Sequence, residues 1–349
     1  MAEGFQVGVT RDFLKPDGSL IFGDIGLNLL GDAPDIHWEF LTENASELRS
    51  EQVQLYDALL LFGPRVTART LEGTSRLTIV ARFGVGYDQV DLDACTNHGV
   101  ALTITPDGVR RPVAVSAITF ILALAHKLLI KDRLTRTGRW TERGDYMGQG
   151  LTGRVLGVIG FGNIGRDLCS LARPFALRTL VYDPYADRSN VTTAGIELVD
   201  LDWLLGQADF VCICCALTPE TYHLIDGQRL ALMKPSAYLI NVARGPIIDQ
   251  TALTKAVREG HIAGAGLDVF EHEPIDPSDP LLSLENVILS PHAICWTDEC
   301  FSGNGRSACQ SILDVAAGRI PRNVVNREVL CHPQFVERLR AYGARASTT

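Results

Sequence analysis

The 349-residue sequence has no uninterrupted run of about 18 apolar residues, the length that a membrane-spanning helix requires. Its longest apolar run, 117–125, is too short and lies in the middle of the chain. The first nine residues have neither the basic region nor the apolar core of a signal peptide. We therefore expect no membrane partner and a cytoplasmic location.

The sequence also has no excess of positive charge. It contains 32 Lys and Arg against 41 Asp and Glu, which gives a net charge of -9 and a pI near 5.4. Surfaces that bind nucleic acid are cationic, so this balance argues against a nucleic-acid partner. A small anionic ligand is still compatible with it, because a single local arginine can bind a carboxylate.

A zinc-binding pattern is missing as well. The nine cysteines form no CxxC pair accompanied by a second pair or by histidines, so no metal is expected. Three of them, Cys212, Cys214 and Cys215, lie in an apolar run that is typical of a buried strand. The simplest interpretation is a set of reduced cysteines in the cytoplasm.

The remaining composition is that of an ordinary globular protein. Hydrophobic residues make up 46% of the chain and charged residues 21%. Short apolar runs alternate with helix-length polar segments, which predicts parallel α/β sheets. The predicted strands are 6–10, 36–40, 58–62, 77–81 and 100–104 in the first part, then 155–159, 178–182, 210–215, 237–242, 262–269 and 287–290.

Between the two strand series, the segment 112–134 is long and broadly apolar, which predicts one buried helix. A polar, glycine-rich stretch follows at 135–152, and further helices are expected at 164–173, 250–259 and 297–318. We therefore predict two α/β domains with a cleft between them, 1–104 plus 299–349 and 105–298.

The segment 160–165 contains the pattern GxGxxG at Gly160, Gly162 and Gly165. It follows a predicted strand and opens the predicted helix that begins at Ile164, the context in which this pattern binds a dinucleotide pyrophosphate. Asp183 ends the next strand, 18 residues after Gly165, where a carboxylate accepts the ribose hydroxyls. This arrangement favours NAD over NADP.

Simpler interpretations exist for both features. The glycines could form a tight turn in a domain without a nucleotide, and Asp183 could be a turn residue before Pro184. Arg188 lies close to Asp183 in the sequence and is the cation that could accommodate NADP.

Three further segments end predicted strands, and in open α/β sheets ligands bind at the carboxyl ends of strands. They contribute Arg244, the acidic turn 271–273 and His292. An arginine grips a carboxylate in bidentate fashion, a histidine transfers a proton near neutral pH, and a glutamate beside it stabilises the imidazolium. Alternatively, Arg244 could be a surface residue, the turn merely solvated and His292 a loop histidine, with His272 as a competing base.

Together these segments make the chain similar to the D-isomer-specific 2-hydroxyacid dehydrogenases, a family that includes D-3-phosphoglycerate dehydrogenase and glyoxylate/hydroxypyruvate reductase. The similarity covers nearly the whole chain. Six motifs carry it in the family's order, namely RFGVGYDQVD at 82–91, GFGNIG at 160–165, LTPET at 217–221, NVARG at 241–245, DVFEHEP at 268–274 and SPH at 290–292.

The resemblance implies a flavodoxin-like substrate domain and an NAD-binding Rossmann domain. It implies hydride transfer between NAD and C2 of a small D-2-hydroxy or 2-oxo acid, of the hydroxypyruvate, glyoxylate or phosphoglycerate type. The implied catalytic residues are Arg244, Glu273 and His292. The implied cofactor contacts are Gly160, Gly162, Asn163, Ile164, Gly165, Asp183, Ala216, Leu217, Thr218, Val242, Ala243 and Asp268. The implied substrate contacts are Gly84, Val85, Gly86, Arg244 and Trp296.

Two departures from the family pattern stand out. Val115 follows Val113-Ala114 where the family has a glutamate, and Trp296 follows His292 where most relatives have small residues. Trp296 either shrinks or caps the substrate pocket, or it is a core aromatic residue on the returning helix.

The resemblance also leaves alternatives for the function. Corepressors similar to this family keep the fold and sense NAD, and other dehydrogenases act on longer sugar acids. The apolar helix and the polar arm at 135–150 predict a homodimer, because the family uses this region to embrace a second subunit.

Overall fold

A computed structural model describes residues 4–187 and 196–346. Its internal contacts divide the chain into two compact units. The first unit comprises Met1–Val109 and Trp296–Thr349, and the second comprises Arg110–Cys295. The sequence placed these boundaries at 104/105 and 298/299. The assignment of substrate binding to the first unit stays a prediction.

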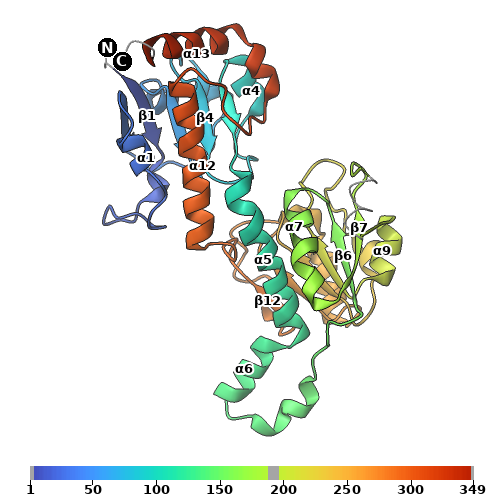
Figure 1. Ribbon diagram of the computed structural model, residues 1–349. Helices are drawn as coiled ribbons and strands as arrows, with labels where there is room; N and C mark the ends of the chain where they lie inside the picture. Colours follow the sequence, from blue (N-terminus) through green and yellow to red (C-terminus); the bar gives the residue numbers. More distant parts are fainter. Residues whose placement is uncertain (1–3, 188–195, 347–349) are drawn as a thin grey trace. The chain divides into compact units, whose positions relative to one another are not determined.

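The first unit is built on five parallel strands in the order β2-β1-β3-β4-β5. The strands are β1 Phe5–Val9, β2 Ile36–Phe40, β3 Ala58–Leu61, β4 Ile79–Arg82 and β5 Ala101–Thr103. The helices are α1 Asn28–Gly31, α2 Ser50–Val53, α3 Ala68–Leu71, α4 Leu92–Asn97, α12 Asp298–Ala316 and α13 Pro333–Ala346. Figure 1 shows α12 lying along this sheet, where its buried Phe301, Ala308 and Ile312 join the core.

The strand order of the first unit reverses direction between β1 and β3, both of which pair in parallel register. At such a reversal the connections leave on opposite faces of the sheet, and the carboxyl ends of the two strands flank a natural ligand crevice. The segments that follow β1, β3 and β4 therefore meet at this edge.

The second unit has seven parallel strands in the order β12-β11-β10-β9-β6-β7-β8. The strands are β6 Val155–Ile159, β7 Arg178–Tyr182, β8 Glu197–Leu198, β9 Phe210–Ile213, β10 Tyr238–Asn241, β11 Gly264–Leu267 and β12 Val287–Leu289. The helices are α6 Leu128–Arg136, α7 Asn163–Ala172, α9 Leu201–Gln207, α10 Gly227–Leu230 and α11 Gln250–Arg258. The order reverses between β6 and β9, as in doubly wound dinucleotide-binding sheets.

The long helix α5, Pro106–Ala125, begins in the first unit and continues into the second. By length and mean hydropathy it could cross a membrane, but 61% of its apolar window is buried inside the structure. Phe120, Ile121 and Leu124 pack with Phe210 of β9 in a core of the second unit. The helix is thus apolar because it covers the sheet (Figure 1).

The prediction of one continuous helix over 112–134 is wrong. The helix α5 ends at Ala125, Lys127 adopts a left-handed conformation with φ 52°, and α6 then begins at Leu128. The carbonyl of Ala125 accepts a hydrogen bond from the Gln149 N–H at 2.7 Å, so a distant segment caps the helix end. Apolar periodicity carries no information about such a partner.

The expected α/β class with two parallel sheets is confirmed, and all eleven predicted strands are present. The two-residue strand β8 and the helix α13 were not predicted. The helix α13 packs in the first unit through Phe335 and Tyr342.

Candidate active site

His292 lies in the loop after β12, at the carboxyl edge of the second unit's sheet. Its backbone is in the left-handed region, with φ 53°, which a non-glycine residue adopts only when its surroundings hold it there. Its N–H donates to the Asp268 carbonyl at 2.8 Å.

The buried side chain of Asp268 holds the same loop. Its Oδ1 accepts hydrogen bonds from the N–H groups of Ala293 and Ile294 at 2.9 and 3.0 Å. Burial raises the pKa of Asp268 above its ordinary value, although these hydrogen bonds and the one from Ser290 oppose the rise. Asp268, predicted to contact the cofactor, therefore also fixes the backbone that carries His292.

Glu273 lies beside His292, with 2.7 Å between Glu273 Oε2 and His292 Nδ1. The other carboxylate oxygen accepts the Phe270 N–H at 2.9 Å. Partial burial acts to raise the pKa of Glu273, but the hydrogen bonds and the charges of His292 and Arg244 outweigh it, and the pKa is lowered. The carboxyl is therefore ionised and can only accept hydrogen bonds.

This pairing determines which imidazole nitrogen of His292 exchanges protons. Because the carboxylate of Glu273 only accepts, His292 Nδ1 must carry the hydrogen between them. The hydrogen bond and the charge of Glu273 raise the pKa of His292, against the opposing effects of burial and of Arg244. The titrating atom is consequently Nε2.

Arg244 follows β10, in a turn shaped by Asn241. The Asn241 side chain donates to the Arg244 carbonyl at 2.9 Å and accepts the Ala243 N–H at 3.0 Å. A Cβ at Gly245 would collide with the carbonyl of Phe270, so only glycine allows this turn to approach the segment that holds Glu273. The charge of Arg244 acts on both Glu273 and His292, which brings the three predicted catalytic residues into one electrostatic group.

Sequence reasoning missed a second histidine–carboxylate pair. His223 Nε2 lies 2.8 Å from Glu271 Oε1, and the Glu271 N–H donates a hydrogen bond to Gln250 Oε1 at 3.0 Å. Glu271 was considered only as part of a solvated turn, and nothing in the linear pattern links it to His223. His272, the competing base, is exposed, and Glu273 contacts His292 instead.

The glycine loop has the shape that a pyrophosphate requires. Gly160 has φ 97°, and a Cβ there would come within 2.6 Å of the Cys215 backbone nitrogen. A Cβ at Gly165 would collide with the Gly160 carbonyl, whereas one at Gly162 would meet no described atom within 4 Å. The open space at Gly162 lies at the N-terminus of α7, next to Asn163 and Ile164, where helix N–H groups bind phosphate.

Asp183 ends β7 beside this loop. One of its oxygens accepts the Phe161 N–H at 2.7 Å, and the other accepts the Tyr185 N–H at 2.9 Å. The turn role considered from the sequence is thus present, and the carboxylate also anchors the glycine loop. Each oxygen keeps a second lone pair, so acceptance of ribose hydroxyls remains chemically open. Arg188 lies outside the described residues.

The remaining predicted cofactor residues follow β9 and β10, at the same edge of the parallel sheet as the glycine loop. Thr221 Oγ1 donates to the Ala216 carbonyl at 2.8 Å and accepts the Thr218 N–H at 2.7 Å, which gives the segment after β9 a fixed turn. These predicted contacts are Ala216, Leu217, Thr218, Val242 and Ala243, all of them exposed or half-buried.

In the first unit, the predicted carboxylate-binding loop follows β4. The buried Gly84 N–H donates to Thr105 Oγ1 at 2.8 Å and is therefore already engaged. The N–H groups of Val85 and Gly86 make no hydrogen bond with the residues that the structure describes, so these two remain as candidate donors. Trp296 precedes α12 and is 47% exposed, so it is not a core aromatic residue on that helix.

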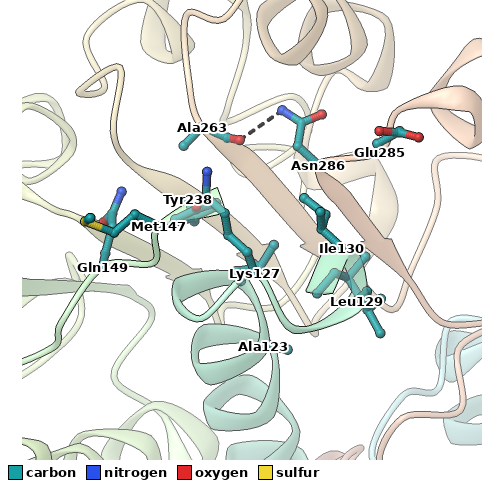
Figure 2. Close-up of a pocket in the computed structure, with 12 residues that line it drawn as sticks. Ala123, Lys127, Leu129, Ile130, Met147, Gln149, Tyr238, Ala263, Glu285 and Asn286 are labelled. Atoms are coloured by element: carbon teal, nitrogen blue, oxygen red, sulfur yellow. Dashed lines mark hydrogen bonds between the residues drawn. The ribbon is translucent and has the colours of Figure 1, made fainter. Parts of the chain in front are cut away.

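A cavity of about 280 Å³ in the second unit lies away from this chemistry (Figure 2). Tyr238, Ala263 and Asn286 line it at the amino ends of β10, β11 and β12, whereas the candidate catalytic residues follow the carboxyl ends of these strands. Met147 and Gln149 close it from the segment after α6. It belongs to the base of the arm and not to the active site.

Comparisons with known proteins identify the family of the chain. The family model described as D-isomer specific 2-hydroxyacid dehydrogenase, NAD binding domain, matches residues 118–293. The glyoxylate reductase of Thermococcus onnurineus is 40% identical over 301 residues, which cover 84% of this chain and 90% of that relative. The glyoxylate reductase of Pyrococcus furiosus is 36% identical over 313 residues, covering 87% and 93% of the two chains.

Solved structures show the same architecture. The D-lactate dehydrogenase of Aquifex aeolicus, complexed with NAD and lactic acid, superposes with a TM-score of 0.78 at 27% identity, over 89% of this chain and 96% of that one. A Thermus thermophilus protein reaches a TM-score of 0.81 at 29% identity, over 92% and 100%. The chain therefore belongs to the D-isomer-specific 2-hydroxyacid dehydrogenase family, as an oxidoreductase whose cofactor is NAD.

Proposed function

We propose that the protein reduces a small 2-oxo acid to the D-2-hydroxy acid, using Arg244, Glu273 and His292. The observation that carries the proposal is the 2.7 Å contact between an ionised Glu273 and His292 Nδ1, in the field of Arg244. The relatives from Thermococcus and Pyrococcus are glyoxylate reductases, which supports a small 2-oxo acid as substrate.

Each side chain has a distinct task in this reaction. Arg244 binds the anionic substrate and polarises its keto oxygen, which an arginine does through paired N–H groups. His292 donates the proton from Nε2 to that oxygen, while Glu273 stabilises the imidazolium and keeps the ring oriented. NADH, when bound, supplies the hydride to C2. The Val85 and Gly86 N–H groups are assigned to the substrate carboxylate.

His292→Ala should lower kcat for 2-oxo acid reduction by about 10²- to 10⁴-fold, the usual contribution of a general acid. The Kd of NADH, measured by fluorescence titration, should stay within about twofold because the histidine acts on the substrate. His272→Ala is the matched control and should keep parent turnover. If the two variants exchanged these phenotypes, His272 would be the proton donor.

Glu273→Gln should move the alkaline limb of the pH profile of reduction to lower pH. Reduction needs protonated His292, so activity is present below the pKa of His292 and is lost as pH rises through it. Glu273 raises that pKa, and removing its charge lowers it again. The profile of kcat/KM against pH measures the shift. Glu285→Gln, at the opposite end of the sheet, is the control; an unmoved alkaline limb in Glu273→Gln would contradict the assignment.

We propose a preference for NADH over NADPH, because the Asp183 carboxylate repels a 2′-phosphate. Arg178, at the start of β7, is paired with Glu197 at 2.8 Å and does not offset this charge. Asp183→Asn should lower the ratio of kcat/KM for NADH to kcat/KM for NADPH by about tenfold, which is the effect expected from one partly solvated charge contact. Asp202→Asn on α9 removes the same charge elsewhere and should leave the ratio unchanged. A parent enzyme that prefers NADPH would refute the preference.

We also propose a homodimer formed through α6 and the arm that follows it. Leu128, Leu129, Trp140 and Met147 expose 56%, 47%, 61% and 81% of their surface, an unusual concentration of large apolar side chains. The location is proposed to be cytoplasmic, because the nine cysteines, all within the described residues, form no disulfide bond.

Light scattering at micromolar concentration should give twice the chain mass of 38.1 kDa. Introducing a charge into the apolar arm by Met147→Glu together with Trp140→Glu should shift the protein to monomer. Leu55→Glu changes an equally exposed residue of the first unit and should leave the dimer intact. A monomeric parent protein would remove the proposal.

A further inference from the structure

Six aromatic rings gather at the carboxyl ends of β1, β3 and β4 in the first unit. Phe22 stacks on Phe301 with 3.9 Å between ring centroids, and Trp296 meets Phe22 edge-on at 5.1 Å. Phe62 contacts both Phe22 and Trp296, at 5.2 and 6.4 Å. The set, called the aromatic cluster below, consists of Phe13, Phe22, Phe62, Phe83, Trp296 and Phe301.

The aromatic cluster has a buried base and an accessible face. Phe13, Phe83 and Phe301 are buried and belong to the core of the first unit. Phe22 and Phe62 are half-buried, and Trp296 is 47% exposed. The accessible face lies where the strand order reverses between β1 and β3, the position at which open α/β sheets bind ligands. Phe22 and Phe62 pack against this core with part of their surface, and together with Trp296 they form the accessible face of the aromatic cluster.

The aromatic cluster adjoins the anion-binding loop of the same unit. Phe83 immediately precedes Gly84, and the Arg82 guanidinium lies 5.9 Å from the Phe62 ring centroid. Arg82 Nε also donates to the Gly86 carbonyl at 2.8 Å, so its positive charge lies under the loop whose N–H groups we assign to the carboxylate. The loop that we assign to the substrate carboxylate and the accessible face of the aromatic cluster are thus neighbours at the carboxyl edge of the first unit's sheet.

The outer rim of the aromatic cluster is acidic. A hollow of about 480 Å³ beside Phe22 is lined by Asp24, Asp298 and Glu299. Carboxylates on this rim repel a substrate whose far end carries a phosphate or a second carboxylate. This rim therefore argues against the phosphoglycerate type of substrate that the family resemblance leaves open.

We propose that the preferred substrates are 2-oxo acids with a large uncharged apolar side chain, aromatic or branched aliphatic, which packs against Phe22, Phe62 and Trp296. The inference rests on the proposed function, since it assigns the substrate class of that reaction. Glyoxylate has no side chain and hydroxypyruvate has a polar one, so neither would bury this aromatic surface. Each additional buried methylene favours the larger acid, and one methylene alone discriminates by about 10- to 200-fold.

The test compares kcat/KM for phenylpyruvate and 4-methyl-2-oxopentanoate with kcat/KM for glyoxylate and hydroxypyruvate. The full-length protein is used with saturating NADH. We expect both larger acids to exceed both smaller ones by at least about tenfold. Equal or higher values for glyoxylate or hydroxypyruvate would overturn the inference while leaving the proposed function in place. No turnover of any of the four acids would refute the proposed function itself, and this inference with it.

Two variants locate the selectivity in the aromatic cluster. Trp296→Ala and Phe22→Leu should each lower the ratio of kcat/KM for phenylpyruvate to that for glyoxylate by about tenfold, chiefly through KM for phenylpyruvate. Trp296→Phe keeps an aromatic ring and should restore most of the ratio. Trp203→Ala on α9 removes a tryptophan that is similarly exposed, at 45%, and should leave the ratio at the parent value. An unchanged ratio in Trp296→Ala and Phe22→Leu would overturn the inference.

Discussion

The arrangement of the candidate active site depends on the buried carboxylate of Asp268. Removing this group from water costs free energy. Two backbone N–H groups of the loop 290–294 offset part of that cost by donating hydrogen bonds to the carboxylate. The same residue's carbonyl accepts the N–H of His292, whose left-handed backbone would otherwise be unstable. The position of the imidazole beside Glu273 is therefore set by hydrogen bonds between the loop after β12 and Asp268, which follows β11, and not by the side-chain pair alone.

Parallel strands explain why distant sequence motifs converge. The turns after β6, β9, β10, β11 and β12 must lie at one edge, because all these strands run in the same direction. This constraint makes the site largely predictable from the sequence once the strands are recognised by their apolar runs. The glycine loop, Arg244, Glu273 and His292 each follow such a run, and the structure places each one after the strand expected.

The features that were not predicted depend on contacts between segments that lie far apart in the sequence. No motif or periodicity in either segment indicates its partner. The break at Lys127 is set by the hydrogen bond from Gln149 to the end of α5, and lysine has no intrinsic preference for positive φ. The engagement of the Gly84 N–H by Thr105 removes one of three expected donors, and the His223–Glu271 pair joins two loops far apart in the chain. Trp296 was left between two interpretations because exposure is a property of the folded surface, which a single residue's identity does not reveal.

Gly245 joins the turn that carries Arg244 to the segment that holds Glu273, because the two segments approach too closely for any larger residue. Any side chain there would displace the Phe270 carbonyl, and the N–H of the same residue holds Glu273. In a randomised library selected for turnover, position 245 would therefore tolerate only glycine, although the residue has no functional group. The failed clones would resemble enzymes with a damaged acid–base residue, and inspection of their catalytic side chains alone would not reveal the cause.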